Sequence, residues 1–215
     1  MTDFAAARRN MVDGQIRTAD VTDLRILWAF QETPRERFVP PQSAGLAYLD
    51  FDLPVAAHRF LMKPRVLSKL LQVADIKGTD RVLDVGCATG YGAAILSRIG
   101  AHVVALEEDA ALARTAREAL ADRTNVEVVS GSLAAGAPAS APFDVIVVEG
   151  ATEVVPEALL RQLSDGGRLL CILGGDRAAK AMLYLRSGDD VGGRTVFDAA
   201  APVLPGFTRP LVFAF

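Results

Sequence analysis

A regular alternation of strand-like and helical segments from Arg81 onward constrains the fold more than any other feature of the sequence. The run RVLDV at residues 81–85 predicts a strand, residues 93–98 predict a helix, and HVVAL at residues 102–106 predicts the next strand. Continuous apolar runs, as opposed to alternating ones, are typical of strands buried on both faces of a parallel sheet. The pattern therefore predicts an α/β fold built from βαβ units.

The same pattern continues toward the C-terminus. Further strands are predicted at residues 126–129, 144–148, 168–173, 181–186 and 211–215. Further helices are predicted at residues 110–120 and from about Pro156, and a glycine-rich loop is predicted after the strand at 181–186.

The first 75 residues have a different pattern. Helical spacing of apolar residues predicts two helices before about Gln31, with Trp28 in the apolar core. Pro34, Pro40 and Pro41 then predict irregular or short extended chain, before a helix at residues 65–73. With 215 residues, we expect one domain over 1–215, in which residues 1–75 form an N-terminal helical extension on the substrate side.

Composition narrows the functional classes. The formal net charge of −3 gives no broad attraction to nucleic acid or to an anionic membrane, so neither is an expected partner. Charged residues near the N-terminus and the lack of a long apolar run predict neither a secretory signal nor a membrane span, and hence a cytoplasmic protein. Two cysteines and two histidines in total predict neither a disulfide framework nor a metal site.

The sequence VLDVGCATGYG, residues 82–92, places a sharp glycine turn between a buried strand and a helix. Small residues there let the backbone approach a ligand, and free N–H groups at a helix start can receive polar ligand atoms. Ala88 and Tyr91 stand where a dinucleotide fingerprint requires glycine, and no Gly-Lys-Ser/Thr follows. The turn therefore disfavours a nicotinamide site and excludes a P-loop.

Glu107 is the second candidate ligand residue, at the end of the next predicted strand. A carboxylate at this position can accept both hydroxyls of a ribose, as in open α/β sheets that bind adenosine-containing ligands. The alternative is a solvated helix start, where acidic residues are favoured by the helix dipole. Together with the turn at Gly86, Glu107 favours the ligand interpretation.

Segments along almost the whole chain resemble, in the same order, those of the protein-L-isoaspartate O-methyltransferase family. They are MVDGQIRTADVTDLRIL, TPRERFVP, LAYLDFDLPV, VLDVGCATGYGAAIL, APFDVIVVEGA, VPEALLRQL and GGRLL. The resemblance implies a class I S-adenosylmethionine-dependent methyltransferase, which is Rossmann-like, with a mostly parallel sheet and helices on both faces. It also implies S-adenosylmethionine as cofactor and, as reaction, methylation of abnormal isoaspartyl carboxylates in the repair of damaged proteins.

The resemblance also implies a cofactor site. Asp84, Gly86 and Gly90 would line the methionine end, and Glu107 would hold the ribose. The other candidates for cofactor binding are Cys87, Tyr91, Glu108 and Ser132. Ser132 stands where the family often has an aspartate that accepts from the adenine amine, and a hydroxyl accepts more weakly.

The reacting end departs from the family pattern. Phe60 and Met62 stand where the family usually has hydroxyl residues, the second of which is associated with catalysis. Replacement donors to an acceptor carboxylate would come from His58, Arg59, Lys63 and Arg65, the alternative being a solvated basic loop.

Glu149, after the fourth strand of the sheet, is a further catalytic candidate. It stands where the family commonly has a small or hydroxyl residue. A carboxylate there could hold a substrate amine or act as a base, and the alternative is a solvated carboxylate at the rim.

Two functions follow from these features. The first is an active methyltransferase of the isoaspartyl type, acting on a carboxylate of damaged protein or on a related acceptor. The second is a non-catalytic homologue that binds the cofactor but has lost methyl transfer, which Phe60 and Met62 favour. The preserved turn and Glu107 favour cofactor binding in both cases.

Overall fold

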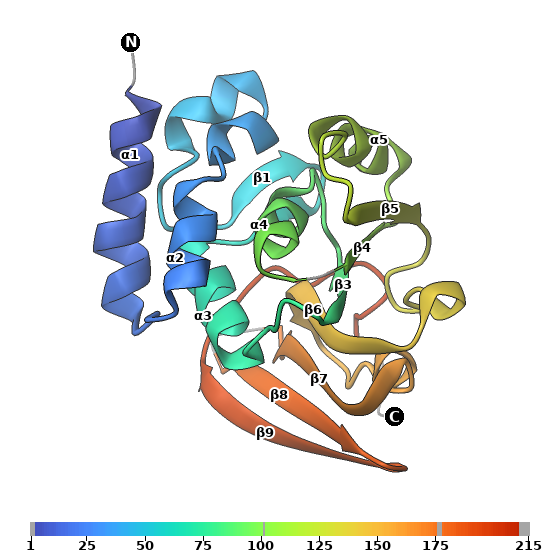
Figure 1. Cartoon of the computed structure of the whole chain (residues 1–215). Helices are drawn as coiled ribbons and strands as arrows, with labels where there is room; N and C mark the ends of the chain where they lie inside the picture. Colours follow the sequence, from blue (N-terminus) through green and yellow to red (C-terminus); the bar gives the residue numbers. More distant parts are fainter. Residues whose placement is uncertain (1–2, 101, 176–177, 211–215) are drawn as a thin grey trace, which may run out of the picture.

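A seven-stranded sheet with the strand order β5-β4-β3-β6-β7-β8-β9 forms the centre of the molecule (Figure 1). The computed structural model describes residues 3–100, 102–175 and 178–210. The strands of this sheet are β3 (Arg81–Val85), β4 (His102–Glu107), β5 (Val126–Ser130), β6 (Phe143–Thr152), β7 (Leu163–Leu173), β8 (Lys180–Ser187) and β9 (Asp190–Asp198).

Strand pairing confirms the predicted parallel core. β3 lies between β4 and β6 and is parallel to both, and the parallel arrangement extends to β5 on one side and β7 on the other. β8 and β9 complete the sheet as antiparallel strands. The prediction of a glycine-rich loop after β8 is wrong, because Gly192 and Gly193 lie within β9 and pair with β8. The strand predicted at 211–215 lies outside the described residues.

Helices cover the two faces of the sheet unequally. They are α1 (Phe4–Met11), α2 (Leu24–Gln31), α3 (Pro64–Ala74), α4 (Tyr91–Ile99), α5 (Ala110–Ala119) and α6 (Glu157–Leu160). Helices α1 to α5 contribute buried side chains to one apolar core. The sheet contributes Val82 and Val103, among others, to the same core. Leu83 and Val104 point to the opposite face, where α6 and irregular chain around Leu133 form a second core.

Short helical segments connect the longer elements. They are the π-helical η1 (Val12–Ile16) and the 3₁₀ turns η2 (Arg17–Ala19), η3 (Arg35–Phe38), η4 (Pro41–Leu46) and η5 (Pro138–Ser140). In the part of the chain that is described, no helix has the length and apolar character needed to cross a membrane.

The two N-terminal helices are confirmed, but Trp28 is not a core residue. It is 51% exposed, and the Arg98 guanidinium lies 5.1 Å from its ring centre. Helix α2 buries the face that carries Ile26, Leu27 and Phe30. Trp28 follows Leu24 by one helical turn, so both lie on the exposed face.

A separate two-stranded sheet precedes α3. Its strands, β1 (Leu53–Ala56) and β2 (Arg59–Leu61), are antiparallel, and their register pairs Leu53 with Leu61. His58 lies in the connecting turn with φ of 57°, in the left-handed region. The segment predicted as irregular or short extended chain therefore contains a hairpin, called the β1–β2 hairpin below.

Candidate functional site

The glycine turn lies at the carboxyl edge of the sheet, as predicted. Gly86 follows β3 directly with φ of 83°, and Gly90 precedes α4 with φ of 94°. A Cβ on Gly86 would lie 3.0 Å from Leu204 Cδ1, and one on Gly90 would lie 2.8 Å from Leu120 Cδ1. Both positions therefore need glycine for its conformation as well as for space.

Glu107 is the last residue of β4, beside this turn, and it is fully buried. Its Oε1 accepts hydrogen bonds from Arg59 Nη1 at 2.5 Å and from the Asp109 amide at 3.0 Å. Its Oε2 accepts from Arg59 Nη2 at 2.6 Å and from the Ala88 amide at 2.8 Å. The interpretation of Glu107 as a solvated helix start is therefore wrong.

Arg59 contradicts the solvated basic loop. Its side chain is 4% exposed, and Nη2 also donates to the Gly86 carbonyl oxygen at 3.2 Å. The guanidinium and the Glu107 carboxylate form a buried pair with two parallel hydrogen bonds, the strongest geometry for these groups. Arg59 therefore faces the ligand turn rather than solvent.

Asp84 and Glu149 form a second buried acidic group next to the turn. Apart from the interaction between these two carboxyl groups, neither oxygen of Asp84 nor Oε1 of Glu149 has a hydrogen-bond partner among the described residues. Burial raises the pKa of Glu149 to about 7, and burial together with the Glu149 carboxylate raises the pKa of Asp84 well above its usual range. The pair therefore holds a proton near neutral pH. It can accept a hydrogen bond from a donor or bind a cation.

The position of Glu149 follows from an irregularity in β6. The register between β6 and β7 shifts between Val147 and Ala151, so Glu149 lies in a bulged part of the strand. Its side chain turns inward and is 4% exposed, which makes the predicted alternative of a solvated rim carboxylate wrong. A Cβ on Gly92 would lie 1.3 Å from Glu149 Oε1, so the carboxyl group occupies the space over this glycine.

Gly92→Ala is expected to destabilise the protein by about 1–3 kcal/mol, because the methyl group and the Glu149 carboxyl cannot share this space. Urea denaturation of the single variant and of Gly92→Ala with Glu149→Ala would measure the coupling. The second change should recover most of the loss. Gly14→Ala is the matched control, since a Cβ there meets nothing within 4 Å. An equal loss in the presence and absence of Glu149 would contradict the explanation.

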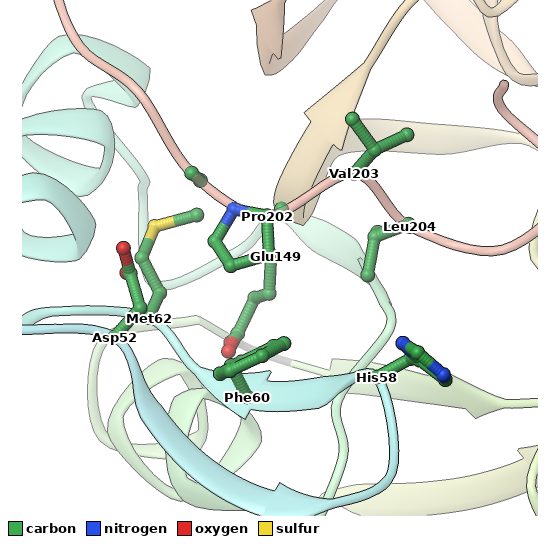
Figure 2. Close-up of a pocket in the computed structure, with 10 residues that line it drawn as sticks. Asp52, His58, Phe60, Met62, Glu149, Pro202, Val203 and Leu204 are labelled. Atoms are coloured by element: carbon green, nitrogen blue, oxygen red, sulfur yellow. The ribbon is translucent and has the colours of Figure 1, made fainter. Parts of the chain in front are cut away.

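A small cavity of about 10 Å³, room for about one water molecule, lies beside Glu149. Figure 2 shows the side chains of Asp52, Phe60, Met62 and Glu149 gathered around it, with His58 on the other side. The two positions at which hydroxyl groups were expected, Phe60 and Met62, therefore both line this cavity. Lys63 does not line it, because its amide and its Nζ bind Asp52 at 3.0 and 3.2 Å.

The remaining predicted cofactor residues do not all lie at the glycine turn. Cys87 is buried in the turn, and burial raises the pKa of its thiol well above the usual range. The Tyr91 ring packs edge-on against Phe30 and Phe38 of the N-terminal segment. Glu108 and Ser132 are exposed. The structure thus brings Asp84, Gly86, Cys87 and Glu107 together, whereas the ring of Tyr91 contacts the N-terminal segment.

Two residues at the site were not predicted as functional. Arg35 is fully buried and donates to the carbonyl oxygens of Ala47 at 2.8 Å and Met62 at 3.0 Å, which fixes the end of the β1–β2 hairpin. It lies in the segment TPRERFVP, which carried the family resemblance. Leu204 covers Gly86 and also Gly150, where a Cβ would lie 2.5 Å from Leu204 Cγ. The sequence around Leu204 contains no motif that would have marked it as part of the site.

Comparison with known proteins decides the family. The sequence profile described as protein-L-isoaspartate(D-aspartate) O-methyltransferase matches residues 6–200. The chain belongs to this family. It is similar to protein-L-isoaspartate O-methyltransferase 1 of Rhodopseudomonas palustris, with 38% identity over 194 residues that cover 88% of this chain and 79% of the relative. With the enzyme of that name from Methanoregula boonei it shares 39% identity, covering 84% of each chain.

One solved structure agrees with the family assignment, and a second, of lower identity, shows the same fold. A structure named protein-L-isoaspartate O-methyltransferase matches with a TM-score of 0.80 and 26% identity, covering 93% of this chain but 66% of the other. A Plasmodium falciparum structure assigned to the same activity, in complex with S-adenosyl-L-homocysteine, matches with a TM-score of 0.76 and 16% identity, covering 92% and 97%. This member of the family is therefore an S-adenosylmethionine-dependent O-methyltransferase with the class I fold, as predicted.

Proposed function

We propose that the chain transfers a methyl group from S-adenosylmethionine to a carboxylate of a protein or peptide, either an isoaspartyl site or a related acceptor. The observation that carries the proposal is the position of the small cavity beside the glycine turn and the Asp84–Glu149 pair. Asp52, His58, Phe60 and Met62 line this cavity, which supports residues 1–75 as the substrate side. The formal net charge of −3 supports a protein acceptor over a nucleic acid or a membrane.

The residues around the turn fit the proposed cofactor. The buried Asp84 carboxyl group, which interacts with Glu149 and has no other partner, suits the cationic methionine end, and Gly86 lets the backbone approach it closely. Glu107 has the position and charge to accept ribose hydroxyls. When bound, the cofactor supplies an electrophilic methyl group, and an acceptor carboxylate needs accurate placement more than activation.

Glu149 is the group that we assign to the placement of the acceptor. Phe60 and Met62 cannot donate hydrogen bonds, and a carboxylate buried against them without partners would bind poorly. A protonated Glu149 lines the same cavity and can donate one, whereas an ionised Glu149 would repel the acceptor. Since burial raises the pKa of Glu149 to about 7, the protonated form is populated at neutral pH.

Turnover is therefore expected to depend on pH through Glu149. The active form is the protonated one, so the rate should be level at low pH and fall by about tenfold per pH unit above the pKa of Glu149, which is about 7 without ligand and is lowered by a cationic cofactor. In Glu149→Gln, the amide keeps a donor without titrating, so the profile should lose this fall. Rates measured from pH 5.5 to 9 on an isoaspartyl peptide test this. A rate that rises through pH 7 in the original protein would instead make Glu149 a base.

The alternative is a homologue that binds the cofactor without methyl transfer, which the absence of hydroxyl side chains at Phe60 and Met62 favours. Calorimetric titration with S-adenosylhomocysteine, followed by transfer of labelled methyl groups to an isoaspartyl peptide, separates the two functions. Binding with transfer supports the enzyme. Binding without transfer to any carboxylate acceptor supports the alternative.

A further inference from the structure

Arg59 saturates the carboxylate that is placed to hold a ribose. A carboxylate has room for about four hydrogen bonds. Glu107 receives two from backbone amides, of Ala88 and Asp109, and two from the Arg59 guanidinium. While Arg59 is in place, Glu107 has no acceptor site left for hydroxyl groups. Removal of Arg59 alone would free two, one on each oxygen, which is the number that a ribose diol needs.

Other contacts at the turn also leave little space for a ligand. Arg59 Nη2 donates to the Gly86 carbonyl oxygen at 3.2 Å, and Leu204 approaches to 3.0 Å of the Cβ position of Gly86. The cavity beyond them, about 10 Å³, is far smaller than an adenosine-containing molecule. The turn and Glu107 favour binding of an adenosine-containing ligand, but the described conformation is closed to it.

The turn end of the hairpin, next to Arg59, is suited to move, whereas the other end is anchored by the buried Leu53 and Leu61 and by the Arg35 hydrogen bond to the Met62 carbonyl oxygen. β1 and β2 pair only with each other among the described strands, and three of the residues around their turn, Ala56, Ala57 and His58, are exposed. Arg59 Nε is buried without a partner, which weakens the closed arrangement. The Glu107 carboxylate would keep its two amide donors if the hairpin moved away.

We propose that the β1–β2 hairpin is an autoinhibitory gate, in which Arg59 occupies the ribose position on Glu107 and must leave before S-adenosylmethionine binds. The gate rests on the proposed cofactor site but not on the acceptor. Because the cofactor binds only the open state, its apparent affinity is lowered by the fraction of molecules that are open. Arg59 thus opposes binding of the cofactor, although it lies next to Glu107, where a residue that binds the ligand would be expected.

The test measures S-adenosylhomocysteine binding by calorimetry in the full-length protein and in Arg59→Ala. Loss of the competing guanidinium should tighten binding by at least tenfold. Arg65→Ala, which removes an exposed arginine paired with Asp50, is the matched control and should leave the affinity unchanged. Arg59→Gln, which cannot form the charged pair, replaces Arg59→Ala if the latter does not fold, and should also tighten binding.

Hydrogen exchange supplies a second readout. Saturating S-adenosylhomocysteine should speed exchange of the amides of residues 56–59, at the turn end of the hairpin, in the unaltered protein, although ligand binding ordinarily slows exchange. Tight binding by the original protein, with no gain in either Arg59 variant and no faster exchange, would overturn the gate and leave the cofactor site standing. No binding by the original protein or by a folded Arg59 variant would overturn the cofactor site together with the gate.

Discussion

Replacement of Glu107 by alanine is expected to lower the free energy of unfolding by about 3–5 kcal/mol, the usual effect of removing one partner of a buried ion pair. The Arg59 guanidinium, whose side chain is 4% exposed, would keep its bond to the Gly86 carbonyl oxygen but lose both hydrogen bonds to its charged partner. The backbone amides of Ala88 and Asp109 would also lose their acceptor. Urea denaturation at neutral pH would measure the change.

The same substitution removes the proposed ribose acceptor. We expect S-adenosylhomocysteine binding to be about 1–3 kcal/mol weaker in folded Arg59→Ala with Glu107→Ala than in Arg59→Ala alone, the cost of leaving the hydroxyls without a charged partner. Calorimetry at a temperature well below the unfolding midpoint separates this effect from the loss of stability. Unchanged affinity would remove Glu107 from the site.

Arg59→Ala with Glu107→Ala is the control for the loss of stability. If an unpaired buried arginine causes most of the loss, the double variant should be more stable than Glu107→Ala alone. If both variants lose the same stability, the cost lies in the unpaired amides of Ala88 and Asp109. The ion pair would then contribute little.

The sequence predicted the sheet well because its signals are local. The continuous apolar runs of β3, β4 and β6 reflect burial on both faces, and a glycine turn that requires positive φ is visible in Gly86 and Gly90. β9 was missed since glycines in a strand resemble those of a loop. Gly193 is in fact needed there, because a Cβ would lie 2.6 Å from the Tyr184 ring.

The site was predicted only where a motif marks it. Glu107 could be found from its place after a strand, but its pairing with Arg59 joins residues 48 positions apart and depends on how the hairpin packs. The burial of Glu149 was not predictable either, because it results from the bulge in β6 and the space over Gly92. Local patterns therefore identified the carboxylates but not which groups surround them.

Phe60→Thr combined with Met62→Ser is expected to raise turnover on an isoaspartyl peptide by about a hundredfold, with little change in cofactor affinity. Both side chains line the cavity beside Glu149, where hydroxyl groups could donate to the acceptor carboxylate. One donor that acts chiefly in the transition state commonly contributes a factor of this size to the rate. Single-turnover methyl transfer, measured with cofactor in excess, would report this step.

The control for this prediction is Phe60→Ala with Met62→Ala, which opens the same space without adding donors. Met62 is buried, so both double variants lose packing and should lose similar stability, about 2–5 kcal/mol for such a truncation. A higher rate in the hydroxyl variant alone would identify donors as the missing element. Equal gains in both would show that space limits the reaction. No gain in either, with His58→Ala abolishing activity, would place the acceptor against His58 rather than Lys63, whose Nζ already binds Asp52.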